Sequence, residues 1–294
     1  MKTEALAARI DSYFRVAAYP PADFEVVGTM SREQGVPLED YATPAFMSRF
    51  NGLMLDNAPE VGVVYTLVFP ARDVLADVVQ RAAGRPAMVF THHPMDFETS
   101  GRGLIPIGER DLQMLKDAGI SLYSAHAPLD CHDLISTSRA LARVAGVKVE
   151  GEAGNMNGLF WGVHGRIRPT AIGDFVRKVG SACGVERVDS KEYSGSVEHV
   201  LVVAGGATYP ELMEGALAIG CDTYLTGDFR VRHSGPWAEE HRPHFDAFVD
   251  SVELNLVGAS HYATEAVVLE SEMLGWFNGL GLPAEFVPQA DPWR

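Results

Sequence analysis

The chain has 294 residues, of which 47% are hydrophobic and 21% are charged, a composition typical of a globular protein with one large or two ordinary domains. Its 39 acidic and 24 basic residues leave a net charge of −15, which argues against a general nucleic-acid surface and against attraction to anionic membranes. No stretch approaches the roughly 20 apolar residues of a membrane span. The three cysteines form no C-x-x-C motif, and Met1 to Tyr13 predict an amphipathic helix and not a signal peptide, so a cytoplasmic location is expected.

The first half of the chain predicts alternating helices and strands. Two helices are expected near its start, at 1–13 and 37–49. A nearly continuous run of β-branched and aromatic residues then predicts a buried strand at 61–69. The elements expected after it are a helix at 72–83, a strand at 87–90, a helix at 108–118 and a strand at 120–124. This strand-helix-strand order predicts a parallel sheet.

The same order recurs in the second half. The expected elements are a strand at 199–204, a helix at 210–219, a strand at 223–226, a helix at 244–254 and a strand at 255–259. Between the copies, the small and polar residues 151–157 predict a boundary, followed by a strand at 159–167 and a helix at 172–183. The proline-containing tail, 282–294, is expected to be irregular. The sequence therefore predicts an α/β fold of two pseudo-repeated domains, 1–150 and 151–294.

Histidines and carboxylates repeat in this chain at a fixed offset of 135 residues. The corresponding positions are His93 and Asp228, His126 and His261, and Asp130 and Glu265. All of them lie just after predicted strands, at the end of a parallel sheet where ligands normally bind. The repeat predicts two copies of one structural unit that deliver imidazole and carboxylate groups to a common place.

These residue types point to metal chemistry. Counting His92, His93, Asp130, His261 and Glu265 gives three imidazoles and two carboxylates, and such groups hold divalent ions such as zinc, manganese or iron. One open mononuclear site rarely takes five protein ligands, so two ions bridged by a carboxylate are expected. Two ions roughly 3.5–4 Å apart hold a bridging hydroxide that attacks an electrophilic carbon or phosphorus. Since each half supplies part of the set, the site is expected between the two copies.

Taken together, these motifs resemble those of the Nif-three-like proteins, also called dinuclear metal-centre hexameric proteins (domain of unknown function 34). The matching stretches span most of the chain in the family order: Asn51-Gly52-Leu53, Thr91-His92-His93-Pro94, the segment from Leu122 to Asp130, Leu225-Thr226-Gly227-Asp228, and His261-Tyr262-Ala263-Thr264-Glu265. The resemblance implies two interlinked α/β domains with a two-metal cleft between them, and a ring-shaped homo-hexamer. Some members of the family are named type 2 homologues of GTP cyclohydrolase I.

The resemblance also implies roles for single residues. The implied metal ligands are His92, His93, Asp130, His261 and Glu265, with Glu265 bridging two divalent ions. His126 falls on a position that orients Asp130 or a metal-bound water. Asp228, the counterpart of His93, is expected to hydrogen-bond a ligand.

The chain departs from the family pattern at two places. Ser260 stands where the family usually has a glycine, a change expected to leave the ligands intact. Near Val68 the family's usual aspartate is missing, and Phe69-Pro70 follows, so a more apolar cleft wall is expected.

The function expected from these observations is that of a metal-dependent hydrolase, in which a metal-bridging hydroxide attacks a small molecule such as a nucleotide. The alternative is a non-catalytic metal-binding or regulatory hexamer; no general acid can be identified. His164 and His199 are expected to be satisfied structural residues. His241 and His244 are expected in a solvated loop with a helix start, and Gly205-Gly206 in a tight turn and not a phosphate-binding loop.

Overall fold

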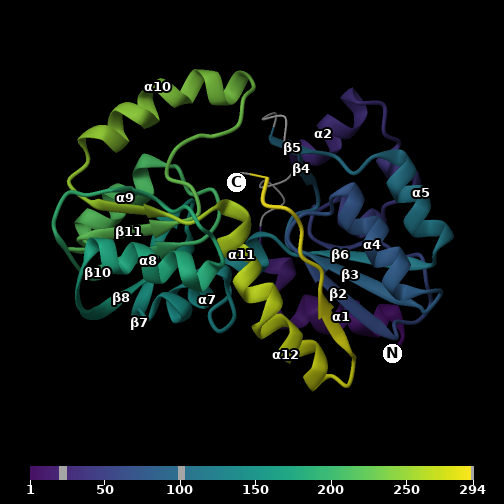
Figure 1. The fold of residues 1–294 in the computed structure, drawn as a ribbon. Coiled ribbons are helices and arrows are strands. Elements are labelled where there is room, and N and C mark those ends of the chain that lie inside the picture. Colours follow the sequence, from purple (N-terminus) through teal and green to yellow (C-terminus); the bar gives the residue numbers. More distant parts are fainter. Residues whose placement is uncertain (20–24, 99–102, 293–294) are drawn as a thin grey trace. The chain divides into compact units, whose positions relative to one another are not determined.

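In a computed structural model of the chain, residues 1–19, 25–98 and 103–292 are described, and they form two compact units (Figure 1). Unit 1 comprises Met1–Glu98, Leu104–Leu129 and Leu269–Ala290, and unit 2 is built mainly from Asp130–Val268. The first unit is therefore discontinuous in sequence, because residues from near the end of the chain complete it.

Unit 1 contains a five-stranded sheet with the order β1-β6-β3-β2-β13. Its strands are β1 (Gly52–Leu55), β2 (Val63–Leu67), β3 (Ala87–Thr91), β6 (Ile120–Ser124) and β13 (Ala284–Phe286). Strands β2, β3, β6 and β13 run parallel, and β1 is antiparallel to β6. Every residue of β2, β3 and β6 is buried, as expected of parallel strands that are covered on both faces.

Helices cover both faces of this sheet. On one face, α4 (Arg72–Ala82) and α5 (Glu109–Asp117) share a core with alternate side chains of β2 such as Tyr65. On the other face, Phe90 packs against Phe14 and Phe277, with ring centroids 6.3 and 5.4 Å away. The other elements that complete unit 1 are α1 (Thr3–Tyr13), η1 (Val16–Ala18), α2 (Glu25–Glu33), η3 (Leu38–Asp40), α3 (Pro44–Met47), α6 (Ala127–Asp130), α12 (Glu272–Gly279) and the two-stranded pair β4 (Asp96–Glu98) and β5 (Gly103–Ile105).

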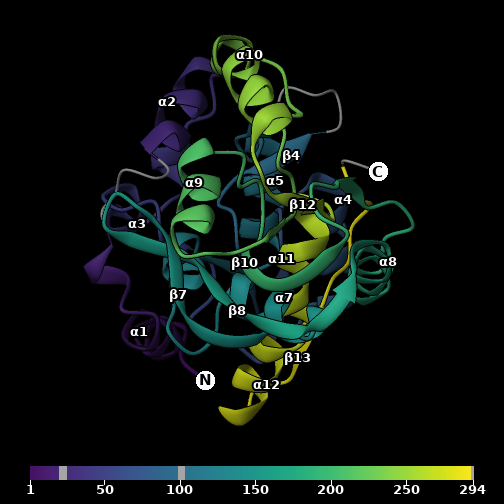
Figure 2. The same cartoon turned by 90° about the vertical axis from the view of Figure 1, so that its left-hand side faces the viewer.

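Unit 2 contains a six-stranded sheet with the order β7-β8-β10-β11-β12-β9. Its strands are β7 (Lys148–Met156), β8 (Leu159–Ala171), β9 (Asp189–Lys191), β10 (Ser196–Val203), β11 (Thr223–Thr226) and β12 (Asn255–Gly258). Strands β10, β11 and β12 are parallel, and the long antiparallel hairpin of β7 and β8 extends the sheet beside β10 (Figure 2).

Alternation along β10 divides the core of unit 2 between two layers of helices. Val200 and Val202 face α7 (Thr137–Ala145) and α8 (Ile172–Cys183), whereas Leu201 and Val203 face α9 (Pro210–Ala218) and α10 (Pro236–Ser251). Because β10, β11 and β12 are parallel, their carboxyl ends, and the segments that follow them, lie at one edge of the sheet. Helix α11 (His261–Glu270) follows β12 there.

The predicted α/β fold with repeated strand-helix-strand order is confirmed. Strands β2, β3 and β6 of unit 1 recur as β10, β11 and β12 of unit 2, with a helix after each strand in both copies. The predicted halves 1–150 and 151–294 stay a prediction, and the compact units are bounded differently because β13 and α12 pack in unit 1.

Three local predictions about secondary structure differ from the structure. The expected helix at 37–49 is broken into η3 and α3, since the Thr43 side chain caps α3 and Pro44 occupies its first turn. The expected boundary at 151–157 lies within β7. The tail contains the short strand β13.

The loop expected around His241 and His244 is also wrong, because α10 already begins at Pro236 and continues through Pro243. Packing of Ala238 and Phe245 against Val231 offsets the weak local helix signal. In the part of the chain that the structure describes, no helix has the length and apolar character needed to cross a membrane.

Candidate metal centre

In unit 1, two of the predicted ligands continue directly from the end of β3. The backbone N–H groups of His92 and His93 donate to the carbonyl oxygens of Leu67 (3.1 Å) and Val68 (3.0 Å). These bonds prolong the parallel ladder between β2 and β3 past the end of the strands. The main chain therefore holds both histidines at the carboxyl edge of the sheet, as the sequence predicts.

His126, which follows β6, joins the same cluster. His92, His93 and His126 each offer a ring nitrogen, and these atoms all lie within 4.8 Å of one another. The three rings have centroids 4.5 to 4.9 Å apart, and His92 and His93 are buried. Three imidazoles this close can serve one ion or two neighbouring ions. The role of His126 in orienting Asp130 stays a prediction.

Hydrogen bonds fix how these rings are presented. Nδ1 of His92 lies 3.0 Å from the carbonyl oxygen of Ala125. Because a carbonyl only accepts, Nδ1 carries the proton and the lone pair of His92 is on Nε2, an arrangement typical of metal-binding histidines. The backbone N–H of His126 donates to Oδ1 of Asn51 (2.8 Å). Asn51 in the Asn51-Gly52 segment therefore has a structural role, because it holds the backbone at His126.

The apolar replacement near Val68 has a specific contact. The ring of Phe69 stacks on that of His93, with centroids 4.3 Å apart and planes inclined by 17°. Val68 itself is fully buried. Phe69 therefore restricts the rotation of His93 and covers one of its faces with hydrocarbon.

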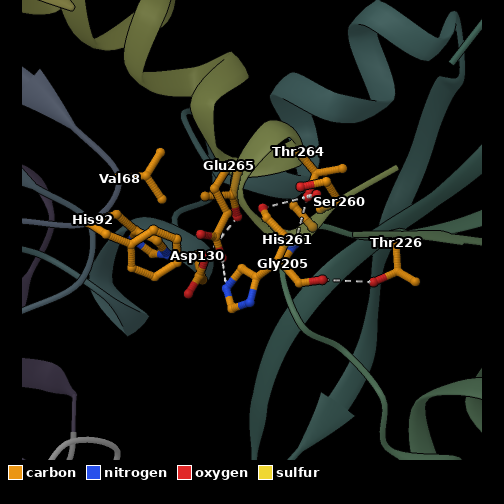
Figure 3. Close-up of polar contacts among 12 residues, drawn as sticks. Val68, His92, Asp130, Gly205, Thr226, Ser260, His261, Thr264 and Glu265 are labelled. Atoms are coloured by element: carbon orange, nitrogen blue, oxygen red, sulfur yellow. Dashed lines mark hydrogen bonds and ion pairs between the residues drawn. The ribbon is translucent and has the colours of Figure 1, made fainter. Parts of the chain in front are cut away.

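In unit 2, His261 and Glu265 lie one turn apart on α11, so both point from the same face of the helix (Figure 3). Nε2 of His261 is 3.0 Å from Oε1 of Glu265. The carboxylate side chain is 4% exposed and the imidazole 14%. An imidazole and a carboxylate this close together offer one nitrogen and one oxygen donor to the same divalent ion.

Three glycines make room for this pair, and the sequence did not identify their role. A Cβ atom on Gly206 would lie 2.9 Å from Nδ1 of His261, and one on Gly205 would collide with the Glu265 carboxylate. A Cβ on Gly227 would lie 2.6 Å from both the Gly205 oxygen and Cα of His261. Gly205-Gly206 forms a bend directly after β10, and its lack of side chains also leaves room for His261 and Glu265. A Gly-Gly pair directly after a strand is the signal that points to such a close approach.

Asp130 and Asp228, the two other acidic residues of the predicted set, also have hydrogen-bond partners within unit 2. Oδ1 of Asp130 accepts a hydrogen bond from the hydroxyl of Thr137 (2.6 Å), which orients a carboxylate that is only 8% exposed. Oδ1 of Asp228 accepts from Nε of Arg232 (2.6 Å), and Arg232 also pairs with Asp189. Asp228 is thus held in a chain of ion pairs.

Ser260 adopts a left-handed backbone conformation, with φ of 76°, which favours glycine. Its hydroxyl accepts from the N–H of Ala263 (3.3 Å) in the first turn of α11, and its carbonyl accepts from the hydroxyl of Thr264 (2.9 Å) (Figure 3). The serine thus combines an unfavourable φ with a helix cap.

We expect Ser260→Ala to lower the free energy of unfolding by about 1 kcal/mol, because alanine keeps the strained φ and loses the cap. Ser260→Gly should stay within about 0.5 kcal/mol of the wild type, since relief of the strain offsets the lost cap. Urea denaturation of the two variants checks this order. An alanine variant at least as stable as the glycine variant would contradict the cap.

The comparisons with known proteins agree with this fold. The model of the family described as Duf34/NIF3 (NGG1p interacting factor 3) matches residues 48–274. A Pseudomonas aeruginosa protein named GTP cyclohydrolase 1 type 2 homolog is 28% identical over 221 residues, which are 73% of this chain and 79% of that protein. A protein of the same name from Archaeoglobus fulgidus is 25% identical over 244 residues, 81% of this chain and 88% of the other.

Solved structures share the fold. A protein related to NIF3 from Bacillus cereus superposes with a TM-score of 0.65 at 12% identity, over 99% of this chain and 97% of its own. A protein from Thermus thermophilus superposes with a TM-score of 0.64 at 20% identity, over 99% of both chains.

Proposed function

Since the chain belongs to the Duf34/NIF3 family, we propose that it is a dinuclear metal-binding protein. Two divalent ions per chain would be held by His92, His93, Asp130, His261 and Glu265, with Glu265 as the bridging ligand. Zinc, manganese and iron all suit such a mixed set of imidazoles and carboxylates.

The observation that carries this proposal is the cluster of three imidazoles after β3 and β6, with its ring nitrogens within 4.8 Å of one another. The donation from His92 Nδ1 to the Ala125 carbonyl places the lone pair of the ring on Nε2, the nitrogen that would bind an ion. The His261–Glu265 pair, with glycines in place of side chains around it, offers the same chemistry in unit 2. Both sets of residues therefore fit a transition-metal ion.

We further propose that the protein is a metal-dependent hydrolase of a small molecule, such as a nucleotide. When bound, a pair of divalent ions lowers the pKa of a shared water and supplies a nucleophile at neutral pH. The name of the Pseudomonas aeruginosa relative, GTP cyclohydrolase 1 type 2 homolog, supports a nucleotide as the first substrate to test. A cavity of about 290 Å³ in unit 2, lined by Gly227, Asp228 and Arg232 among others, supports a small ligand.

The chain's own residues would act on the substrate by orientation. Arg232, fixed between Asp189 and Asp228, presents a guanidinium to the cavity and can hold an anionic or carbonyl group. Phe69 would keep water from one face of His93. Asp228, as the partner of Arg232, would position that guanidinium.

Metal analysis of the purified protein is the first test. After dialysis against micromolar zinc or manganese, we expect two ions per chain that depend on the five proposed ligands. Fewer than one bound ion per chain would overturn the dinuclear proposal. Elemental analysis by mass spectrometry gives this number without reference to activity.

Turnover is tested with metal-loaded protein against nucleotides, phosphodiesters and cyclic amides. Release of product that requires both ions supports the hydrolase. Full metal occupancy without turnover of any of these classes would instead favour a non-catalytic metal-binding or regulatory ring.

We also propose that the chain self-associates as a homo-hexamer in the cytoplasm and does not bind nucleic acid. The family resemblance supports the hexamer, and the net charge of −15 argues against a nucleic-acid partner. Native mass spectrometry would give the number of chains directly.

A further inference from the structure

A second group of nitrogen and oxygen donors lies in unit 2, away from the strand ends that carry His261. Glu150 on β7, His164 on β8 and His199 on β10 offer ligand atoms that all lie within 4.8 Å of one another. Their strands are direct neighbours in the sheet. His199 lies in the N-terminal half of β10, whereas Gly205 of the proposed dinuclear centre follows its C-terminal end.

Irregular pairing brings these three side chains together. The register shifts between Val149 and Gly151 on β7, and between Val197 and His199 on β10. Gly151 pairs with His164, and a Cβ atom there would lie 2.8 Å from Nε2 of His164. The glycine therefore gives the imidazole of His164 the space it occupies.

The hydrogen bonds define the state of both rings. Nδ1 of His199 lies 3.0 Å from the carbonyl oxygen of Gly220, so this nitrogen carries the proton and Nε2 has the lone pair. Nδ1 of His164 is 3.0 Å from that Nε2. A backbone carbonyl that fixes the far side of an imidazole is the usual support of a metal-binding histidine.

The separation of the two nitrogens fits neighbouring ligands of one ion. With metal–nitrogen bonds of about 2.1 Å, a distance of 3.0 Å corresponds to roughly a right angle at the metal. Binding would require only that the Nδ1 proton of His164 moves to its Nε2, so that both lone pairs face the ion. No net proton is gained or lost in this change of tautomer.

The local charge favours a cation. Asp222 accepts the backbone N–H of His199 (2.9 Å), and Glu150 and Glu198 lie 3.6 and 3.4 Å from Arg166. These contacts thus involve three carboxylates and one guanidinium on or beside the strands of the two histidines. Burial raises the pKa of the nearby Cys221 to about 12, and its sulfur is not among the clustered donor atoms.

We propose that Glu150, His164 and His199 form an additional binding site for one divalent transition-metal ion, for which zinc serves as the probe. The bound ion would join three adjacent strands and so brace the edge of the unit 2 sheet. This site is independent of the proposed dinuclear centre and of any activity there.

The test measures zinc binding by the full-length chain in which His93→Ala and Glu265→Ala disable the proposed dinuclear centre. Equilibrium dialysis should find one ion per chain in this background. Adding His164→Ala should abolish that ion, and adding Glu150→Gln, at an exposed position, should weaken its affinity by at least about tenfold. Glu152→Gln, an equal change of charge on the same exposed strand, is the matched control and should have no effect.

Thermal unfolding followed by circular dichroism supplies a second readout. Zinc should raise the midpoint of the parent background and of Glu152→Gln, but not that of His164→Ala. Equal zinc affinity in the parent, His164→Ala and Glu150→Gln chains would overturn the proposal, as would a parent chain that binds no zinc. Loss of the dinuclear centre alone leaves this outcome unchanged, so the two proposals fail separately.

Discussion

Gly227→Ala is expected to lower the free energy of unfolding by about 3 kcal/mol and to weaken metal binding at His261. The added methyl group would lie 2.6 Å from the Gly205 carbonyl oxygen and from Cα of His261, and 2.7 Å from the Ser260 oxygen. All three are backbone atoms of buried segments, so none can turn away as a flexible side chain would. The start of α11 must shift, and the two ligands on that helix shift with it.

Gly215→Ala is the matched control, because Gly215 lies inside α9 with open space where its Cβ would be. There the same change should raise stability by about 0.5–1 kcal/mol, since alanine favours the helix. Guanidinium denaturation measures both variants, and zinc dialysis measures the metal. Equal stability of the two variants would refute the close packing around Gly227.

The double variant His93→Ala with Glu265→Ala is expected to lose both ions of the proposed dinuclear centre while keeping its fold. Each substitution would remove one proposed ligand, and loss of Glu265 would also remove the negative charge that the proposal places beside both cations. His93 and Glu265 are buried, so some loss of stability accompanies the change. Elemental analysis gives the metal content, and circular dichroism reports the fold.

A double variant with the same residue types at exposed positions of α10, Glu240→Ala with His244→Ala, is the control and should retain all of its metal. If the His93→Ala, Glu265→Ala chain still bound both ions of the dinuclear centre, those two residues would not be ligands. Single variants then show which half contributes more to affinity.

Periodicity and strand-end motifs predicted the parallel core of each unit closely. Strands β6 and β11 and helix α8 have the predicted bounds, since their apolar periods and flanking turns are strong. The hairpin strand β7 was missed because its charged residues alternate with small ones such as Gly151 and Ala153, with little hydrophobic signal. Its pairing with β8 depends on tertiary contacts that no local pattern contains.

The sequence predicted the residue types of the candidate site, but not the glycines and hydrogen bonds that position them. The offset of 135 residues pairs His92 in the first copy with Gly227 in the second. The structure gives the reason why the second copy has a glycine there and not a histidine. Backbone atoms of Gly205, Ser260 and His261 fill the space that a side chain at 227 would need. Hydrogen bonds such as that from His126 to Asn51 join positions 75 residues apart, which spacing within one motif cannot show.

The late completion of the unit 1 sheet has a consequence for synthesis of the chain. The Thr66 hydroxyl donates to the carbonyl of Leu269, 203 residues later, and β13 then pairs with the edge of β2. On the ribosome, β2 must therefore wait with an unpaired edge until β13 has emerged, while the main segment of unit 2, Asp130–Val268, can fold before it. Unit 1, which contains the first residues synthesised, is thus expected to complete its folding last. A nascent chain stalled before residue 269 would expose the unpaired edge of β2, which folding chaperones are expected to recognise.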